Sequence, residues 1–157
     1  MTEPTASGSI EIAATPDAVF GIISDPLRLT DVAAETVRIL HRRASVGRVG
    51  SRWVGLNRHG WRVWPTTTRV TDAEQGRRFA FEVGMVGIPV SRWQYDIEAS
   101  GDGVRVTEAM WDRRPDWFGP LTVPFTGVPD RVPANTDNIA RTLAALKATA
   151  EAEADRA

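Results

Sequence analysis

Glu108, Tyr95 and Asn57 are the polar residues of this sequence best placed to do chemistry inside an apolar pocket. Each lies in a stretch whose residues alternate between two sides, as in a β-strand. Glu108 shares its side with Val106 and Met110, so we expect its carboxyl group among apolar side chains. Such surroundings raise the pKa of a carboxyl group, which can then act as a general acid or base. Tyr95 could donate a hydrogen bond to a ligand, and Asn57 could bind a ligand carbonyl.

Each of the three residues also has a purely structural interpretation. An isolated buried carboxylate costs several kcal/mol, so a buried Glu108 must be paired or neutral. Glu108 could pair with an arginine, or cap a backbone group near the end of its strand. Asn57 could satisfy the adjoining turn, and Tyr95 could be a core residue with its hydroxyl group satisfied. These alternatives stay open at the level of sequence.

The same alternation predicts the rest of a pocket lining. Small-molecule pockets are lined mainly by apolar and aromatic side chains with a few polar groups. From the strands we expect ligand contacts from Trp53, Asn57, Trp64, Thr66, Phe81, Trp93, Tyr95, Glu108 and Met110. Tryptophan occurs six times in the chain, so an aromatic wall is expected even if single tryptophans only pack in the core.

The elements that must position these residues follow in a regular order. A strand at 9–13 precedes two short helices, one capped by Thr15 with Pro16 at its first position and one at 26–32. Further strands are predicted from residue 36 and at 51–59, 61–71, 78–83, 88–99 and 104–113. Residues 115–132, rich in Pro, Gly and aromatic side chains, are expected to form an ordered loop. Hairpins dominate, which favours an antiparallel and strongly bent sheet.

A long helix is predicted from about residue 133 to 156, with Asp130 as its cap. Three- and four-residue spacings place one stripe on it, formed by Val132, Asn135, Ile139, Leu143, Leu146 and Ala150. Asn135 lies on the stripe and Thr142 flanks it, where a helix that only closed a core would carry Leu or Ile. We therefore expect the helix to be one wall of a pocket, with ligand contacts from Asn135, Ile139, Thr142 and Leu143.

The composition disfavours several classes of function. A net charge of −1 without a basic cluster argues against nucleic-acid binding. With no cysteine and two histidines, we expect no metal site and no thiol nucleophile, and no cofactor is predicted. No stretch approaches the roughly 18 apolar residues of a membrane span, and we expect a cytoplasmic protein. The 157 residues should form a single domain, with residues 1–6 as a flexible tail.

Several segments together resemble the START-like superfamily known as SRPBCC, which includes polyketide cyclases and dehydrases. The matching segments are IAATPDAVF at 12–20, DP at 25–26, VGSRWVGLNR at 49–58, GRRFAF at 76–81, WQY at 93–95, GVRVTE at 103–108 and LAALK at 143–147 with Glu151. The resemblance implies an α+β helix-grip fold, with a curved antiparallel sheet of about seven strands wrapped round a long C-terminal helix. It also implies a cavity between them, in which members bind lipids, steroids, plant hormones or polyketides, although only some members are enzymes.

Three functions are compatible with these observations. The first is binding of a hydrophobic, partly oxygenated small molecule, lipid-, steroid- or polyketide-like, in the cavity. The second is a polyketide cyclase, aromatase or dehydratase, in which Glu108 is the acid or base and Tyr95 assists. The third is an adaptor for a protein partner, which an exposed apolar patch within 115–129 would support. The sequence favours binding, because it shows one plausible acid or base and nothing that orients it.

Overall fold

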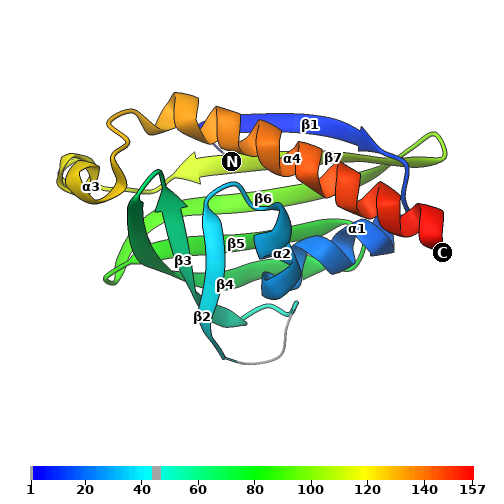
Figure 1. Cartoon of the computed structure of the whole chain (residues 1–157), viewed down its shortest axis with the longest axis horizontal. Coiled ribbons are helices and arrows are strands. Elements are labelled where there is room, and N and C mark those ends of the chain that lie inside the picture. Colours follow the sequence, from blue (N-terminus) through cyan, green and yellow to red (C-terminus); the bar gives the residue numbers. More distant parts are fainter. Residues whose placement is uncertain (1, 44–46) are drawn as a thin grey trace.

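In the computed structural model, which describes residues 2–43 and 47–157, the chain forms one sheet and four helices (Figure 1). In chain order the elements are β1 (Ala6–Ile12), α1 (Pro16–Ile23), α2 (Pro26–Val32), β2 (Thr36–Arg43), β3 (Arg52–His59), β4 (Arg62–Glu74), β5 (Arg78–Met85), β6 (Ile88–Ser100), β7 (Gly103–Asp112), α3 (Phe118–Thr126) and α4 (Arg131–Arg156). This order confirms the predicted α+β class, with two short helices after the first strand and a long C-terminal helix.

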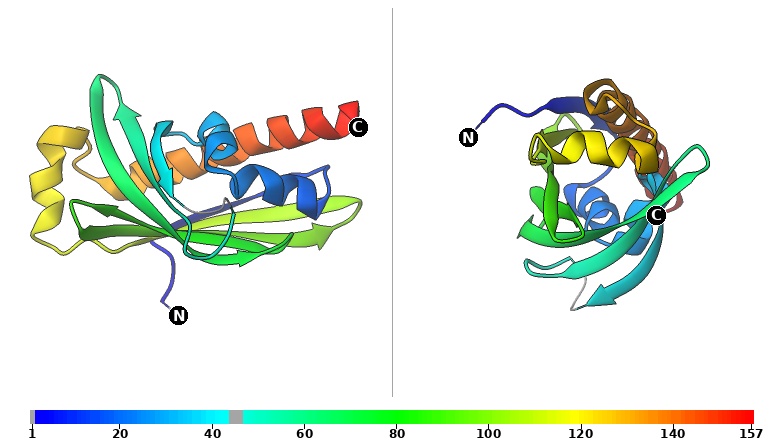
Figure 2. Two further views of the ribbon diagram at one scale, coloured as in Figure 1. Left: turned by 90° about the horizontal axis from the view of Figure 1, so that it is seen from below. Right: turned by 90° about the vertical axis from the view of Figure 1, so that its left-hand side faces the viewer.

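The seven strands form a single antiparallel sheet in the order β1-β7-β6-β5-β4-β3-β2. Consecutive strands from β2 to β7 pair as hairpins, and β1 pairs with β7 at the other edge. The sheet curls strongly, and Figure 2 shows it wrapping round the helices when viewed along its length. Figure 1 shows α4 running across the enclosed side of this sheet, which is the predicted helix-grip arrangement.

Helix α4 begins after a capping residue, Asp130. The side chain of Asp130 accepts a hydrogen bond from the backbone N–H of Val132 at 3.0 Å, which confirms the predicted cap. Of the predicted stripe, Asn135, Ile139 and Leu143 are buried, as are Leu146 and Ala150 further along. Val132 is instead 47% exposed, because it lies in the first turn beyond the part that the sheet covers. No helix in the described part of the chain is long and apolar enough to span a bilayer.

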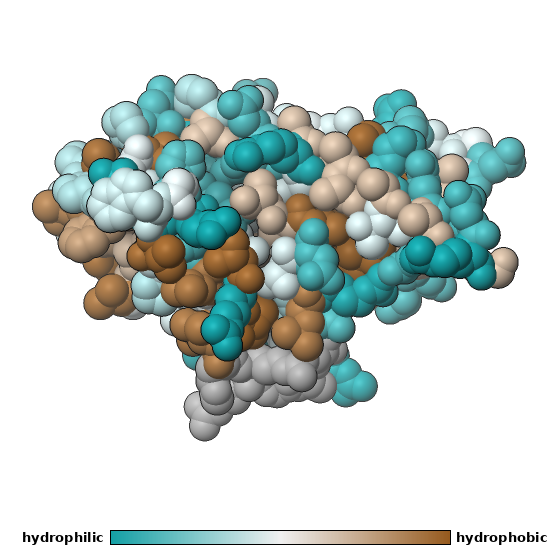
Figure 3. All heavy atoms as spheres, viewed as in Figure 1, coloured by the Kyte–Doolittle hydropathy of each residue, from teal (hydrophilic) through white to brown (hydrophobic). Residues whose placement is uncertain are grey.

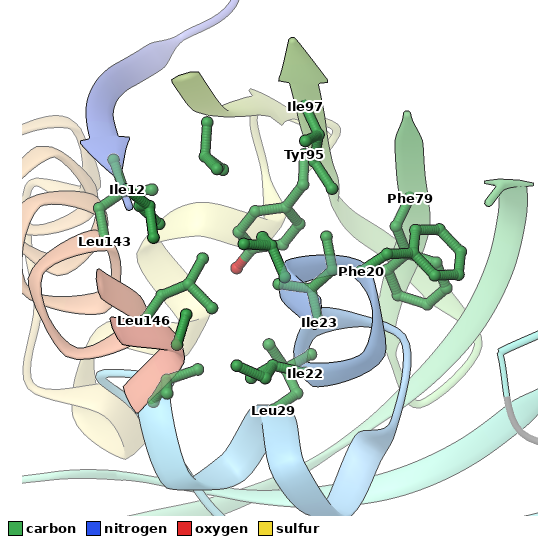
Figure 4. Close-up of a cluster of buried hydrophobic side chains, with 14 of the residues drawn as sticks. Ile12, Phe20, Ile22, Ile23, Leu29, Phe79, Tyr95, Ile97, Leu143 and Leu146 are labelled. Atoms are coloured by element: carbon green, nitrogen blue, oxygen red, sulfur yellow. The ribbon is translucent and has the colours of Figure 1, made fainter. Parts of the chain in front are cut away.

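The packed core fills the end of the molecule where α1 and α2 lie between the sheet and the second half of α4. Figure 4 shows Ile22 and Ile23 of α1 pointing towards Leu146, with Phe79 of β5 on the far side. Leu146 and Ile23 are fully buried. The local sequence makes α1 short, since Thr15 caps it through the N–H of Ala18 and residues 25–26 begin the next helix.

Two boundaries differ from the sequence-based predictions. Strand β1 begins at Ala6 rather than residue 9. Residues 6–8 show no alternation of their own, but they pair with β7, with Ala6 opposite Met110. The end of the expected tail is also attached to the sheet, because the Thr5 N–H donates to the Met110 carbonyl of β7 at 2.7 Å. Residues 115–132 are not wholly a loop, because they contain α3.

Helix α3 was not predicted, because Pro124 lies inside it and proline removes a backbone hydrogen bond from a helix. The helix is only nine residues long, so one missing bond does not prevent it. Gly127 ends it in the left-handed conformation, with φ of 71°, and its N–H donates to the Val123 carbonyl at 2.7 Å.

Candidate functional site

A cavity of about 150 Å³ lies between the first half of α4, the concave face of the sheet, the segment from α2 to β2, and α3. Its walls are mostly apolar and aromatic, with a few polar groups. A cavity of roughly this size encloses one aromatic ring. The enclosed space therefore fits a ring-sized group, and a larger ligand would extend towards the opening.

The structure brings together most of the residues predicted to contact a ligand. Those that line the cavity are Trp53, Asn57, Trp64, Thr66, Phe81, Trp93, Tyr95, Glu108, Met110, Asn135 and Thr142. Six different elements supply them, β3 to β7 and α4, so strand alternation correctly identified the concave face on every one of these strands.

Ile139 and Leu143 are the two predicted contacts that do not line the cavity. They are buried in the core against β1 instead. Gly8 lets α4 approach β1 closely, because a methyl group on Gly8 would lie 3.0 Å from Ile139 Cγ2 and 3.5 Å from Leu143 Cδ1. The predicted stripe of α4 thus turns towards β1, and the neighbouring residues Asn138 and Thr142 face the cavity.

Glu108 and Tyr95 form a hydrogen-bonded pair in the wall of the cavity. The two residues pair across β7 and β6, which places their side chains on the same face. Tyr95 Oη donates to Glu108 Oε1 at 2.8 Å, and each residue is 2% exposed. Burial raises the pKa of Glu108 to about 8, and the hydrogen bond from Tyr95 offsets part of that rise. At neutral pH the carboxyl group is therefore mostly protonated.

The pair also decides where the proton of Glu108 lies. Burial, together with the nearby Glu108 carboxyl group, raises the pKa of Tyr95 well above its usual value, so Tyr95 keeps its proton and acts as a donor. Because Glu108 Oε1 accepts that bond, the protonated carboxyl group carries its own hydrogen on Oε2. Among the described residues, Oε2 is the one buried side-chain polar atom without a hydrogen-bond partner. Glu108 thus holds an unused donor, and Tyr95 supplies the orienting group that the sequence did not reveal.

The side-chain amide of Asn57 forms hydrogen bonds within the sheet rather than being available to a ligand. Its Oδ1 accepts from Thr36 Oγ1 and its Nδ2 donates to Thr66 Oγ1, both at 2.8 Å. A longer bond of 3.5 Å reaches the Trp64 carbonyl. The side chain therefore ties β2, β3 and β4 together within the cavity wall. Thr66 accepts the bond from Asn57 and keeps its own hydrogen available.

Two ion pairs line the more exposed part of the cavity, and sequence reasoning missed both. Arg131 Nη1 contacts both carboxylate oxygens of Glu35 at 3.0 and 3.2 Å, and its guanidinium lies 5.4 Å from the ring centre of Trp64. Arg114 Nε donates to the two oxygens of Asp112 at 3.0 and 3.1 Å. These four charged side chains are 13–28% exposed, so they mark the opening of the cavity.

The hydrogen bonds at this opening also fix the charge of Asp112. Burial alone would raise the pKa of Asp112, but hydrogen bonds from the side chain and backbone of Arg114 hold it below its usual range. Both acidic groups of the opening are thus paired with arginines, which leaves Glu108 as the unpaired acid of the cavity. In the described part of the chain, no three His, Cys, Asp or Glu side chains are arranged to hold a metal ion.

Two other lining residues can be explained by spacing along their elements. Asn138 follows Asn135 by three positions, so helical spacing could have assigned it to the same wall. Alternation along β4 places Thr68 on the same face as Thr66, two positions away, although it was not among the predicted ligand contacts, and it lines the cavity. Nothing local identifies Phe118, which reaches the cavity only because α3 folds back over the opening.

Comparisons with known proteins agree with this architecture. The family model described as "Polyketide cyclase / dehydrase and lipid transport" matches residues 3–151. A search of curated proteins found no match. Among solved structures, the polyketide-cyclase-like protein Cgl2372 from Corynebacterium glutamicum is similar with a TM-score of 0.62 and 26% identity, covering 99% of this chain and 97% of that one.

Two further solved structures share the fold at low identity. The di-domain aromatase/cyclase StfQ of the steffimycin biosynthetic pathway has a TM-score of 0.74 and 11% identity over 95% of this chain. The chain covers 51% of StfQ, about half of its length. The Aha1 dimer from Colwellia psychrerythraea has a TM-score of 0.64 and 15% identity, covering 93% of this chain and 95% of that one.

Proposed function

The chain belongs to the polyketide cyclase/dehydrase and lipid transport family, and on that premise we propose that it binds an apolar small molecule bearing a carbonyl oxygen. The ligand places a ring-sized part in the cavity, and its oxygen accepts a hydrogen bond from Oε2 of protonated Glu108. One observation carries this proposal, the unpartnered Oε2 of a buried and protonated carboxyl group in an aromatic cavity.

The direction of Glu108's hydrogen bond sets the class of ligand. A protonated carboxyl group donates, so the complementary atom is an acceptor such as a ketone or ester oxygen. Leaving a buried polar group unpaired costs about 1–3 kcal/mol. A ligand that accepts a hydrogen bond from Oε2 should therefore bind more tightly than an isostere that cannot. Trp53, Trp64 and Phe81 supply aromatic faces for the rest of the ligand. The proposed ligands are therefore ring-containing ketones or esters, the chemistry shared by oxygenated polyketides and steroids.

Acetophenone and α-methylstyrene test this proposal, because they differ only in replacing the carbonyl oxygen by a methylene group. At about pH 6, we expect the wild-type protein to bind acetophenone about tenfold more tightly, as measured by quenching of tryptophan fluorescence. The preference should fall as the pH rises through about 8, because ionised Glu108 cannot donate.

The near-isosteric variant Glu108→Met should lose the preference for acetophenone while still binding both compounds. Glu82→Met is the matched control, since Glu82 is an exposed residue of β5 that does not line the cavity. Equal affinities of the wild-type protein for the two compounds would contradict the role of Glu108. No binding of either compound would contradict the cavity as a ligand site.

A second function, acid-catalysed dehydration or cyclisation, is favoured by one observation. The pKa of Glu108, about 8, lies near neutral pH, where general acids work best, and Tyr95 orients the carboxyl group. The β-hydroxyketone 4-hydroxy-4-phenylbutan-2-one is a suitable probe, because loss of water gives a conjugated enone visible by ultraviolet absorbance. If Glu108 protonates the leaving hydroxyl group and its carboxylate then takes up the proton lost from the carbon next to the carbonyl, water and the enone form and Glu108 is restored. Glu108→Gln should then slow turnover about a hundredfold or more while leaving ligand affinity nearly unchanged. Turnover by Glu108→Gln at the wild-type rate would exclude this role.

A further inference from the structure

Helix α3 carries no charged side chain on either of its sides. Its inner face, formed by Phe118, Thr122 and Thr126, is buried and lines the cavity. On the outer side, Trp117 just before the helix is 60% exposed, and Leu121 and Phe125 at four-residue spacing are 58% and 67% exposed. A surface helix of a monomeric protein normally turns polar residues outward. The outer face of α3 is therefore built for contact with something apolar.

The tip of the β3–β4 hairpin continues this surface. Strand β4 pairs with β5 only from Thr67 onward, so the tip projects beyond the neighbouring strand, as the left view of Figure 2 shows. Arg62 Nε donates to the Pro124 carbonyl of α3 at 3.2 Å, which fixes the tip beside the helix. Trp61 at the tip is 80% exposed. In Figure 3 hydrophobic residues gather over the α3 end of the molecule and over β2 and β3.

The side-chain hydroxyl groups of α3 are already used, which bears on what kind of partner fits. Thr122 Oγ1 donates to the Gly119 carbonyl at 2.8 Å, and Thr126 Oγ1 donates to the Thr122 carbonyl at 3.1 Å. Residues 117–129 contain no charged side chain. A protein interface usually carries about ten direct hydrogen bonds, whereas a bilayer interior requires that polar groups be satisfied internally. The hydroxyl groups of α3 meet the second condition, and the outer residues Leu121 and Phe125 offer no side-chain polar group for the first.

Three arginines lie close to this apolar surface along the chain. Arg58 and Arg62 flank the hairpin tip and Arg113 precedes α3, and none of them forms an ion pair with a described residue. The guanidinium of Arg62 stacks 4.4 Å from the ring centre of Trp61. Asp116 and Asp130 bracket the uncharged segment, and Asp130 is occupied as the cap of α4. Tryptophan side chains with neighbouring arginines suit the headgroup level of an anionic membrane.

The geometry points to a membrane-docking surface, in which α3 and the β3–β4 tip rest on an anionic lipid bilayer and insert Trp61, Trp117, Leu121 and Phe125. Phe118 on the opposite face of the same helix lines the cavity, so docking brings the cavity opening to the bilayer. Insertion gains from buried apolar area, and the arginines add attraction to anionic headgroups. The docking does not depend on which ligand the cavity holds.

Vesicle sedimentation tests this surface directly. We expect the wild-type protein to bind vesicles of phosphatidylcholine containing about one third phosphatidylglycerol, and to bind pure phosphatidylcholine vesicles more weakly. Tryptophan emission should shift to shorter wavelength on binding, because Trp61 and Trp117 leave water. Leu121→Asp should reduce vesicle affinity about tenfold or more, since it places a charge in the inserted face.

Val49→Asp is the matched control for Leu121→Asp. Both residues are exposed, at 63% and 58%, and Val49 lies before β3, at the opposite end of that strand from the tip. Val49→Asp should bind vesicles as the wild-type protein does, and circular dichroism should show both variants folded. Absence of wild-type binding to the anionic vesicles would overturn the proposal. So would equal loss in both variants, or a wild-type dimer in sedimentation equilibrium that Leu121→Asp dissociates, which would assign this face to a second copy of the chain.

Discussion

The two halves of α4 face different surroundings, although they belong to one straight helix. The second half places Leu146 and Ala150 against α1 and the sheet, in a core without space. The first half places Asn135, Asn138 and Thr142 in the wall of the cavity. The second half behaves as an ordinary core helix, whereas the first half keeps amide and hydroxyl groups next to an aromatic space. In the first half, Ile139 and Leu143 still pack against β1, and Asn and Thr on the neighbouring face mark where the binding site begins.

The sharpest test of this contrast exchanges the two types of side chain. Leu146→Asn should lower the free energy of unfolding by about 5 kcal/mol, from lost apolar burial and an amide without partners. Urea denaturation measures the change, and Leu146→Ala, at about 3 kcal/mol, provides a milder version if the first variant is too unstable. A loss below about 1 kcal/mol would show that this half of the helix is not packed as the structure indicates.

The pH dependence of stability probes the cavity half through Glu108. Its folded pKa, about 8, is raised above the ordinary value of 4.5, so the folded protein keeps a proton that the unfolded chain loses. The contribution of Glu108 to the free energy of unfolding is therefore fully present below about pH 4.5. It falls by about 1.4 kcal/mol per pH unit as the pH rises to about 8.

Glu108→Gln should remove this slope, because glutamine does not titrate and can still accept the bond from Tyr95. The difference in the free energy of unfolding between the variant and the wild-type protein should therefore grow from about pH 5 to 8. Over this range it should change by about 4 kcal/mol in favour of the variant. Glu82→Gln, at an exposed position of β5, is the control. Parallel pH profiles of the wild-type protein and Glu108→Gln would show that Glu108 is not buried in its neutral form.

The smallest expected effect comes from the reverse exchange on the cavity side. Asn135 makes one weak hydrogen bond to a described residue, from Nδ2 to Met110 Sδ at 4.0 Å, so its amide contributes little to stability. Asn135→Leu should leave the free energy of unfolding within about 1 kcal/mol of wild type and lower affinity for acetophenone by changing the cavity wall. A loss as large as that of Leu146→Asn would remove the distinction between the two halves.

Local patterns predicted the fold and much of the site. Alternation along β3 to β7 identified which side chains face α4, because a strand has only two faces and most of the aromatic residues share one. Asp130 and Thr15 marked helix starts, since capping depends on residues only a few positions apart. The resemblance stated from the sequence agrees with the matched family.

The rest of the site depends on contacts between distant segments. The rotation of α4 that removes Ile139 and Leu143 from the cavity depends on Gly8, which lies far from them in the sequence. The ion pair of Arg131 with Glu35 joins residues 96 positions apart. Tyr95 and Glu108 were each predicted, yet their mutual hydrogen bond follows only from the register of β6 and β7.

The most direct measurement is the pH titration of the Glu108 carboxyl carbon by NMR, in protein labelled with ¹³C at the glutamate carboxyl groups and with Glu108→Gln assigning the signal. The structure predicts a midpoint near pH 8. Acetophenone should raise the midpoint, because the ligand binds the protonated form. Tyr95→Phe should raise it too, since the Tyr95 hydrogen bond lowers the pKa of Glu108. A midpoint near the ordinary value of 4.5, unchanged by ligand, would contradict a protonated donor in the cavity.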